Sequence, residues 1–279
     1  MRPLLSLLGS RVQEAPVAAR SGVASMMMAV VPPTWAWYDV AIAGYLGLSA
    51  VSLALKPEEV AKATPWSKWS IGYRFKTPCS ARTAMLVKYI PAFCLAGWWA
   101  VTAGGSGEAL MPFLMAAHFG KRIAEVVGVQ DFSGSPTEEL YASGLIALFY
   151  AFVAWLEMRS GPGAVPAIAS AGLATFAVGQ AGNFYHHHVL SQLRKRNGYG
   201  KYHIPEGGLF GLVGCPHYLF EIISWIGAAM VAQSAHAWLV AFWVAGMLGG
   251  RATVTTAWYR DKFGPEYPSD RKHIVPFVF

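Results

Sequence analysis

Long runs of apolar residues, separated by short polar connections, form the main pattern of this chain. A helix needs roughly 20 mostly apolar residues to cross the hydrocarbon core of a bilayer, and most of the runs reach about that length. They predict spanning helices over residues 34–55, 83–103, 110–129, 140–156, 165–190, 208–232 and 237–259. We therefore expect an all-α integral membrane protein, a bundle of about seven transmembrane helices.

Basic residues alternate between the connections of this bundle. Lys and Arg gather after the first, third and fifth runs and in the C-terminal tail, whereas the other connections carry almost none apart from Arg159. The first connection, for example, contains Lys62, Lys68 and Arg74. Because basic loops stay in the cytosol, the alternation predicts an odd number of spans with a cytosolic C-terminus. Topology thus explains the formal net charge of +7, and we expect no nucleic-acid partner.

The composition agrees with a single membrane domain that follows a short lead. Hydrophobic residues make up 54% of the chain and charged residues 13%, whereas about a quarter of an ordinary soluble domain is charged. Residues 1–30 carry Arg2, Arg11 and Arg20 and are interpreted as a disordered lead or a targeting segment. Residues 31–279 are expected to form the membrane domain, in contact with membrane lipid.

Motifs of the common soluble enzymes do not occur in the chain. The sequence has no G-x-G-x-x-G dinucleotide fingerprint, no P-loop, no G-x-S-x-G elbow and no H-E-x-x-H zinc motif. Three histidines follow one another at residues 186–188, but neighbouring helix residues point about 100° apart and cannot all face one ion. The three cysteines show no zinc spacing. The sequence therefore predicts no metal site.

Polar residues follow one face of each of the last three runs. The stripes are Asn183, His187 and Arg194; His217 and Glu221; and Arg251, Thr255 and Tyr259. Polar side chains at membrane depth usually face the interior of a bundle, and Arg grips phosphates through two parallel hydrogen bonds. The stripes predict a shared cavity that binds an anionic ligand.

Each of these polar residues also has a structural interpretation. Asn183 and His187 are candidates for hydrogen bonds between helices, and Arg194 for a positive charge on the cytosolic side. Arg251 is a candidate for a side chain that snorkels to the membrane surface, and Tyr259 for an interfacial aromatic belt.

The C-terminal third resembles a known family. Residues 202–210 (YHIPEGGLF), 221–227 (EIISWIG) and 267–279 (YPSDRKHIVPFVF) are similar to the steroid 5α-reductase family. Gly182-Asn183-Phe184 with His187, and the pair Cys215-Pro216, look more like the related very-long-chain enoyl-CoA reductases. Pro216-His217-Tyr218 resembles the polyprenol reductases. The similarity is specific over about residues 180–279.

The resemblance implies a seven-helix protein of the endoplasmic reticulum membrane that binds NADPH in its cytosolic half. The enzyme would reduce the C=C bond of an α,β-unsaturated carbonyl lipid, a 3-oxo-Δ4 steroid, a trans-2-enoyl-CoA or a polyprenal. Carried over residue by residue, the cofactor contacts are Asn183, His187, Arg194, Tyr202, His217, Glu221, Arg251 and Tyr259. His187, His217 and Thr255 depart from the residues usual in steroid reductases.

The expected carbonyl-binding pair is replaced in this chain. Steroid reductases hold the carbonyl with a Tyr on the third span and an acid on the second, but the third span here carries Phe119 and the second carries Lys88-Tyr89. Our hypothesis is that Tyr89 supplies the hydroxyl and Lys88 lowers its pKa or binds the anion. The alternative is that Tyr89 only packs and Lys88 reaches toward the cytosol.

Two other functions remain open. A membrane methyltransferase of the isoprenylcysteine type would need an Arg-His-Pro-x-Tyr-like run, which Gly214-Cys-Pro-His-Tyr218 matches poorly. Bound S-adenosylmethionine would favour it over a reductase. A non-catalytic membrane scaffold would tolerate alanine at Arg194 and Arg251, whereas a reductase would lose its cofactor.

Overall fold

The computed structural model describes residues 37–56, 75–132, 135, 137–160, 163, 165–197 and 202–279. Seven α-helices lie in this part of the chain, one for each predicted run, which confirms the all-α prediction. They are α2 (Trp37–Leu55), α4 (Ala81–Thr102), α5 (Ser106–Ala124), α6 (Leu140–Met158), α7 (Pro166–Asn197), α8 (Pro216–Ala232) and α9 (Ala235–Phe263). The predictions for residues 1–30 and for Lys62, Lys68 and Arg74 lie outside the described residues.

Three of the described segments are long and apolar enough to cross a membrane by length and composition. They are Ala81–Thr102, Leu140–Met158 and Ala235–Glu266, and Asp39–Leu53 is a shorter apolar helix. Segments of this kind are those of an integral membrane protein. Of the three remaining helices, α5 and α7 carry Lys, Arg and His along their C-terminal halves, which lowers their mean hydropathy, and α8 has 17 residues.

Two predicted boundaries were wrong for local reasons. The sixth run was predicted to start at residue 208, but residues 208–211 form a separate 3-10 helix, η3 (Gly208–Gly211), and α8 begins only at Pro216. Proline favours the first position of a helix because it lacks the N–H that would be unpaired there. The fifth helix continues past residue 190 to Asn197, since its last turns are polar but still favour a helix.

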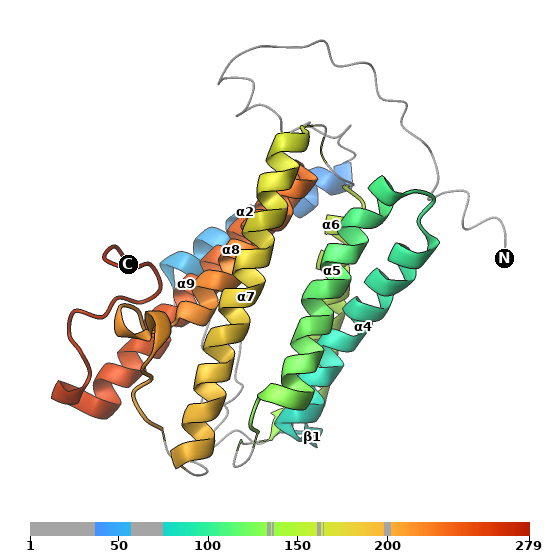
Figure 1. Ribbon diagram of the computed structural model, residues 1–279. Helices are drawn as coiled ribbons and strands as arrows, with labels where there is room; N and C mark the ends of the chain where they lie inside the picture. The colour runs from blue at the N-terminus through green and yellow to red at the C-terminus, as the bar shows by residue number, and fades with distance from the viewer. Residues whose placement is uncertain are drawn as a thin grey trace.

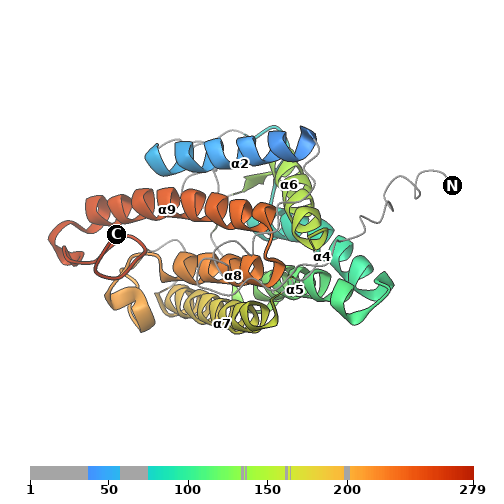
Figure 2. The ribbon, with the colours of Figure 1, turned by 90° about the horizontal axis from the view of Figure 1, so that it is seen from above.

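The helices form two groups that lie beside each other (Figure 1, Figure 2). Seen from above, α2, α9, α8 and α7 follow one another in a row, and α4, α5 and α6 form a cluster next to it. Within the row α7 contacts α8, α8 contacts α9, and α9 contacts α2, while α4 contacts both α5 and α6. The groups meet where α5 approaches α8 and where α6 approaches α9.

Glycines allow α7 and α8 to approach closely. A Cβ atom on Gly179 would lie closer than 3.0 Å to the backbone and side chain of Ser224, and one on Gly227 would meet the backbone of Phe176. Gly172 faces the backbone oxygen of Gly227 in the same way. Small residues at such crossings let helices pack without a strong hydrophobic driving force. This contact fixes the relative position of the polar stripes on α7 and α8.

A two-stranded ribbon ties the segment before α4 to the start of α6. Strand β1 (Pro78–Cys79) pairs antiparallel with β2 (Glu138–Glu139). The Glu139 carboxylate accepts hydrogen bonds from the side chain and backbone of Thr77 and from the backbone N–H of Lys76, and these bonds lower the pKa of Glu139. The ribbon thereby holds the neighbouring Glu138 against α4.

Replacing Gly179 by alanine is expected to destabilise the protein. The added methyl group would overlap the backbone of Ser224, and overpacking of this kind typically costs about 1–3 kcal/mol. The measurement is thermal unfolding of the purified protein in detergent.

Gly97→Ala is the matched control, because a Cβ atom at this helical glycine of α4 meets nothing within 4 Å. It should be neutral or stabilise the protein by up to about 1 kcal/mol. Equal midpoints for the two variants would contradict close packing of α7 on α8.

Candidate functional site

One cavity of about 400 Å³ lies between the two groups of helices, with walls from α4, α5, α6, α7, α8 and α9. Every residue that the sequence singled out for catalysis or cofactor binding lines this cavity: Lys88, Tyr89, Asn183, His187, Arg194, Tyr202, His217, Glu221, Arg251 and Tyr259. Thr255 lines it too. The three polar stripes therefore meet as their spacing predicts, although their chemical roles stay predictions.

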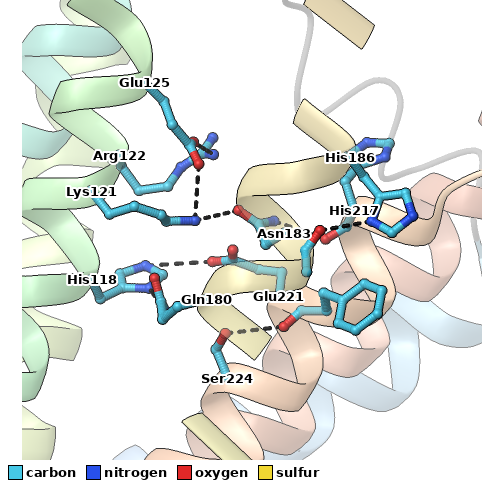
Figure 3. A network of polar contacts seen from close by, with 12 residues as sticks. His118, Lys121, Arg122, Glu125, Gln180, Asn183, His186, His217, Glu221 and Ser224 are labelled. Carbon is cyan, nitrogen blue, oxygen red and sulfur yellow. Dashed lines mark hydrogen bonds and ion pairs between the residues drawn. The ribbon is translucent and has the colours of Figure 1, made fainter. Parts of the chain in front are cut away.

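A polar network joins α5 to α7 and α8 at the cavity wall (Figure 3). Lys121 on α5 donates a hydrogen bond to the side-chain oxygen of Asn183 on α7. The Asn183 amide nitrogen in turn donates to the backbone oxygen of His217, 2.8 Å away. Asn183 thus makes the hydrogen bonds between helices that its structural interpretation predicted, and it faces the cavity as well.

The end of α5 concentrates positive charge beside this network. Its last turn widens into a π-helix, η2 (Glu125–Val129), a distortion that is frequent at functional sites. The fully buried Glu125 pairs with Lys121 at 3.2 Å and also with Arg122. Two cations share one carboxylate, so the cluster keeps a net positive charge next to the cavity.

Glu221 of α8 occupies the middle of the cavity wall. Its Oε1 atom lies 3.3 Å from the indole N–H of Trp225 and 3.4 Å from Nε2 of His118. Since the Gln180 side-chain amide can only donate its N–H to Nδ1 of His118, 3.0 Å away, the His118 proton sits on Nε2 and points to Glu221. The other carboxylate oxygen of Glu221 is buried and has no hydrogen-bond partner in the described chain.

Arginines mark the end of the cavity near the C-termini of α7 and α9. Arg194 donates to the backbone oxygen of Asp131 at 3.0 Å, and Nε of Arg251 donates to the Tyr218 hydroxyl at 3.1 Å. Arg251 is 6% exposed and Tyr259 is 9% exposed. The alternatives of a snorkelling Arg251 and of a Tyr259 in an aromatic belt are therefore wrong.

These donors fit a phosphate-bearing ligand. Arg122, Arg194 and Arg251 line one cavity and have only N–H groups to offer. A buried carboxylate oxygen without a partner, as on Glu221, is costly unless a ligand donor completes it. A nucleotide with an amide group would supply both the phosphates and that donor.

Two of the three consecutive histidines, His186 and His187, make different contacts. Nδ1 of His186 lies 2.7 Å from the backbone oxygen of Gly182, so it donates there and Nε2 accepts the N–H of Leu209 at 3.1 Å. His186 thereby fastens η3 onto α7. Gly208, with φ of +52°, fits against the same ring, and a Cβ atom there would lie 2.7 Å from Nε2. His187 faces the cavity instead, as its place in the polar stripe predicts, whereas the sequence assigned no part to His186.

Lys88 and Tyr89 of α4 have partners that the sequence did not reveal. Nζ of Lys88 lies 2.6 Å from the carboxylate of Glu138, and Lys88 is 2% exposed. The Lys88 ammonium therefore ends on a carboxylate inside the protein and not in solvent. The Tyr89 hydroxyl accepts a hydrogen bond from Arg122 at 3.0 Å. Glu138 carried no signal in the sequence because its strand precedes the fourth run.

The comparisons with known proteins agree with these motifs. The family model described as 3-oxo-5-alpha-steroid 4-dehydrogenase matches residues 141–279. Steroid 5-alpha-reductase DET2 of Gossypium hirsutum is 42% identical over 109 residues, 39% of this chain and 42% of that protein. Very-long-chain enoyl-CoA reductase of Dictyostelium discoideum is 36% identical over 107 residues, 38% of this chain and 35% of that protein.

A longer match comes from Bos taurus. Its 3-oxo-5-alpha-steroid 4-dehydrogenase 1 is 30% identical over 234 residues, 77% of this chain and 88% of that protein. The matches to the plant and human reductases span only about two fifths of those proteins, 41–42%. The family model and the bovine match, which covers more than two thirds of both chains, agree, and the chain therefore belongs to the 3-oxo-5-alpha-steroid 4-dehydrogenase family.

Proposed function

We propose that this chain is a membrane-bound reductase that uses NADPH to saturate the C=C bond of an α,β-unsaturated carbonyl lipid. The observation that carries the proposal is one shared cavity, in which arginines and a buried carboxylate face the same space as apolar side chains. Family membership supports the reaction class. The candidate substrates are a 3-oxo-Δ4 steroid, a trans-2-enoyl-CoA and a polyprenal.

The cofactor would be held by the stripes of α7, α8 and α9 and by the loop before η3. Arg194 and Arg251 would bind its phosphates, and Glu221 would accept a hydrogen bond from its amide. Asn183, His187, Tyr202, His217 and Tyr259 would complete the binding wall. When bound, the reduced nicotinamide supplies a hydride to the β-carbon of the substrate.

Tyr89 is suited to bind the substrate carbonyl. Its oxygen already accepts a hydrogen bond from Arg122, so the hydroxyl hydrogen is directed to another acceptor. A carbonyl oxygen gains negative charge as the enolate forms, and a preorganised donor stabilises it there. Lys88 is paired with Glu138, and its part would be to hold the second span in place next to Tyr89.

An apolar part of the cavity wall would receive the lipid and keep water away. It includes Phe149 and Val153 of α6 and Trp243, Val244 and Met247 of α9. Exclusion of water strengthens every electrostatic interaction inside a site. The indole N–H of Trp243 is a polar group in this wall, buried and without a hydrogen-bond partner in the described chain.

The proposed setting is the endoplasmic reticulum membrane, with seven spans and a cytosolic C-terminus. Lys121 at the end of α5, Arg194 at the end of α7 and Arg260 at the end of α9 come at one end of the bundle (Figure 1). Arg159 is at the other end, beside the start of α9. This distribution supports the orientation that the basic loops predict.

Purified protein in detergent should oxidise NADPH when a suitable enone lipid is added. The assay follows NADPH absorbance with a 3-oxo-Δ4 steroid, a trans-2-enoyl-CoA or a polyprenal, and product analysis must show a saturated C–C bond. Turnover of any one of them supports the proposal and names the substrate class. Tight S-adenosylmethionine binding without NADPH binding would contradict it.

Alanine at Arg194 or Arg251 should weaken NADPH binding about 10- to 100-fold, since a hydrogen bond to a charged group contributes about 1.5–3 kcal/mol. The measurement is a fluorescence titration of NADPH on the purified variants.

Arg196→Ala is the matched control, because Arg196 sits in the same last turn of α7 but does not line the cavity. Its dissociation constant should stay at the wild-type value. An equal loss in all three variants would point to general charge attraction and would contradict a phosphate site.

A further inference from the structure

Phe119 provides no hydrogen-bond donor at the proposed carbonyl site. It stands where the resemblance to steroid reductases expects a tyrosine, and it is buried at 2% exposure. Its ring packs edge-on against His118, with centroids 4.9 Å apart. A phenyl ring in this place offers no hydrogen to a carbonyl oxygen, so the second donor must come from elsewhere if it exists.

Tyr150 of α6 brings a hydroxyl-bearing ring next to that position. Its centroid lies 6.0 Å from the centroid of Phe119. The same ring stacks on Tyr89, with centroids 5.8 Å apart and an angle of 7° between the planes. Tyr150 therefore joins Tyr89 and Phe119 in one aromatic group, and all three line the cavity.

The surroundings of Tyr150 suit a hydroxyl that donates a hydrogen bond to a bound ligand. Arg122, Glu221 and Arg251 line the same cavity as Tyr150. Within the described chain no hydrogen bond is made by the Tyr150 hydroxyl. Tyrosine hydroxyls inside a protein normally find a partner, and a substrate oxygen in the cavity would be one.

We infer that Tyr150 is a second hydroxyl donor to the substrate carbonyl and takes over the role of the hydroxyl missing at Phe119. This inference rests on the proposed function. A carbonyl oxygen has two lone pairs and accepts two donors. Tyr89 and Tyr150 stack with ring centroids 5.8 Å apart and line the same cavity, and the inference assigns both hydroxyls to one substrate oxygen.

The reaction balances without a covalent bond to either tyrosine. A bound reduced nicotinamide would supply the hydride for the new C–H bond at the β-carbon and would leave oxidised. The π pair of the substrate C=C bond would become the double bond of an enolate, and the π pair of the C=O bond would move onto the oxygen between Tyr89 and Tyr150. The C=O bond would re-form as the α-carbon takes up a proton that comes ultimately from water.

The test is Tyr150→Phe, which removes one oxygen and keeps the ring. With the enone that the wild type reduces, we expect kcat to fall about 10²-fold, the usual effect of losing one such donor. The dissociation constant of NADPH and the KM for the enone should stay within about twofold. Tyr141→Phe, on the same helix but 69% exposed, is the matched control and should keep the wild-type kcat.

Restoring the missing hydroxyl at position 119 distinguishes a donor role of Tyr150 from a structural role, because a structural role predicts no recovery of kcat. In the Tyr150→Phe background, Phe119→Tyr should raise kcat at least about tenfold, because it returns a donor to the neighbouring ring. An unchanged kcat in Tyr150→Phe would overturn the inference but leave the proposed reductase function intact. The same holds if the double variant shows no recovery of kcat. Parallel loss of NADPH binding or of the unfolding midpoint in Tyr150→Phe would make Tyr150 structural and would overturn it too.

The outcomes also separate this inference from the proposed function. Wild-type protein that reduces none of the three enones would overturn both. Wild-type protein that reduces one of them, with Tyr150→Phe as active as Tyr141→Phe, would overturn the role of Tyr150 alone.

Discussion

Ionised groups inside the hydrocarbon of a membrane need partners, and this constraint decides how the helices of the chain meet. Lys88 of α4 is buried against Glu138, which the ribbon before α6 supplies. The buried carboxylate of Glu125 faces Lys121 and Arg122 within its own helix. Breaking a buried pair by removing one member costs about 3–5 kcal/mol. The rotation of α4 is therefore fixed by Lys88 more firmly than by its apolar residues, which lipid accepts equally well.

The far end of the bundle obeys the same constraint. Asp39 is the only acid in the first apolar run, and Arg159 is the basic residue that breaks the alternation of the loops. They lie 3.3 Å apart, and Asp39 is also 3.3 Å from Nε2 of His236. Asp39 and Arg159 thus pair with each other, and together with His236 they join α2, the end of α6 and the start of α9. Lys88 and Glu138 pair at one end of the bundle, and Asp39 and Arg159 pair at the other. The cavity lies between the two groups of helices.

The sequence predicted the parts of this structure that depend on local spacing. Helices and polar stripes follow from residues three, four or seven positions apart, so the side of α9 that carries Arg251 and Tyr259 could be assigned. Contacts between distant residues could not: Lys88 and Glu138 are 50 positions apart, and Arg122 and Tyr89 are 33 apart. Tyr150 gave no signal because an aromatic residue within an apolar run is ordinary. The roles of the site residues also stay predictions, since position alone does not assign chemistry.

The two ends of the cavity are under different physical demands, and this explains where the family resemblance is strong. The phosphates and the amide of the proposed cofactor would need charges at fixed distances, and Glu221 is the first residue of one of the motifs, residues 221–227. The proposed lipid would be bound largely by apolar area, which many combinations of side chains provide. Its carbonyl would need a donor hydrogen at one point in space, which any neighbouring helix could supply. Under the proposal, Phe119 beside Tyr150 is a change that this freedom permits, because the donor hydroxyl can come from α6 in place of α5.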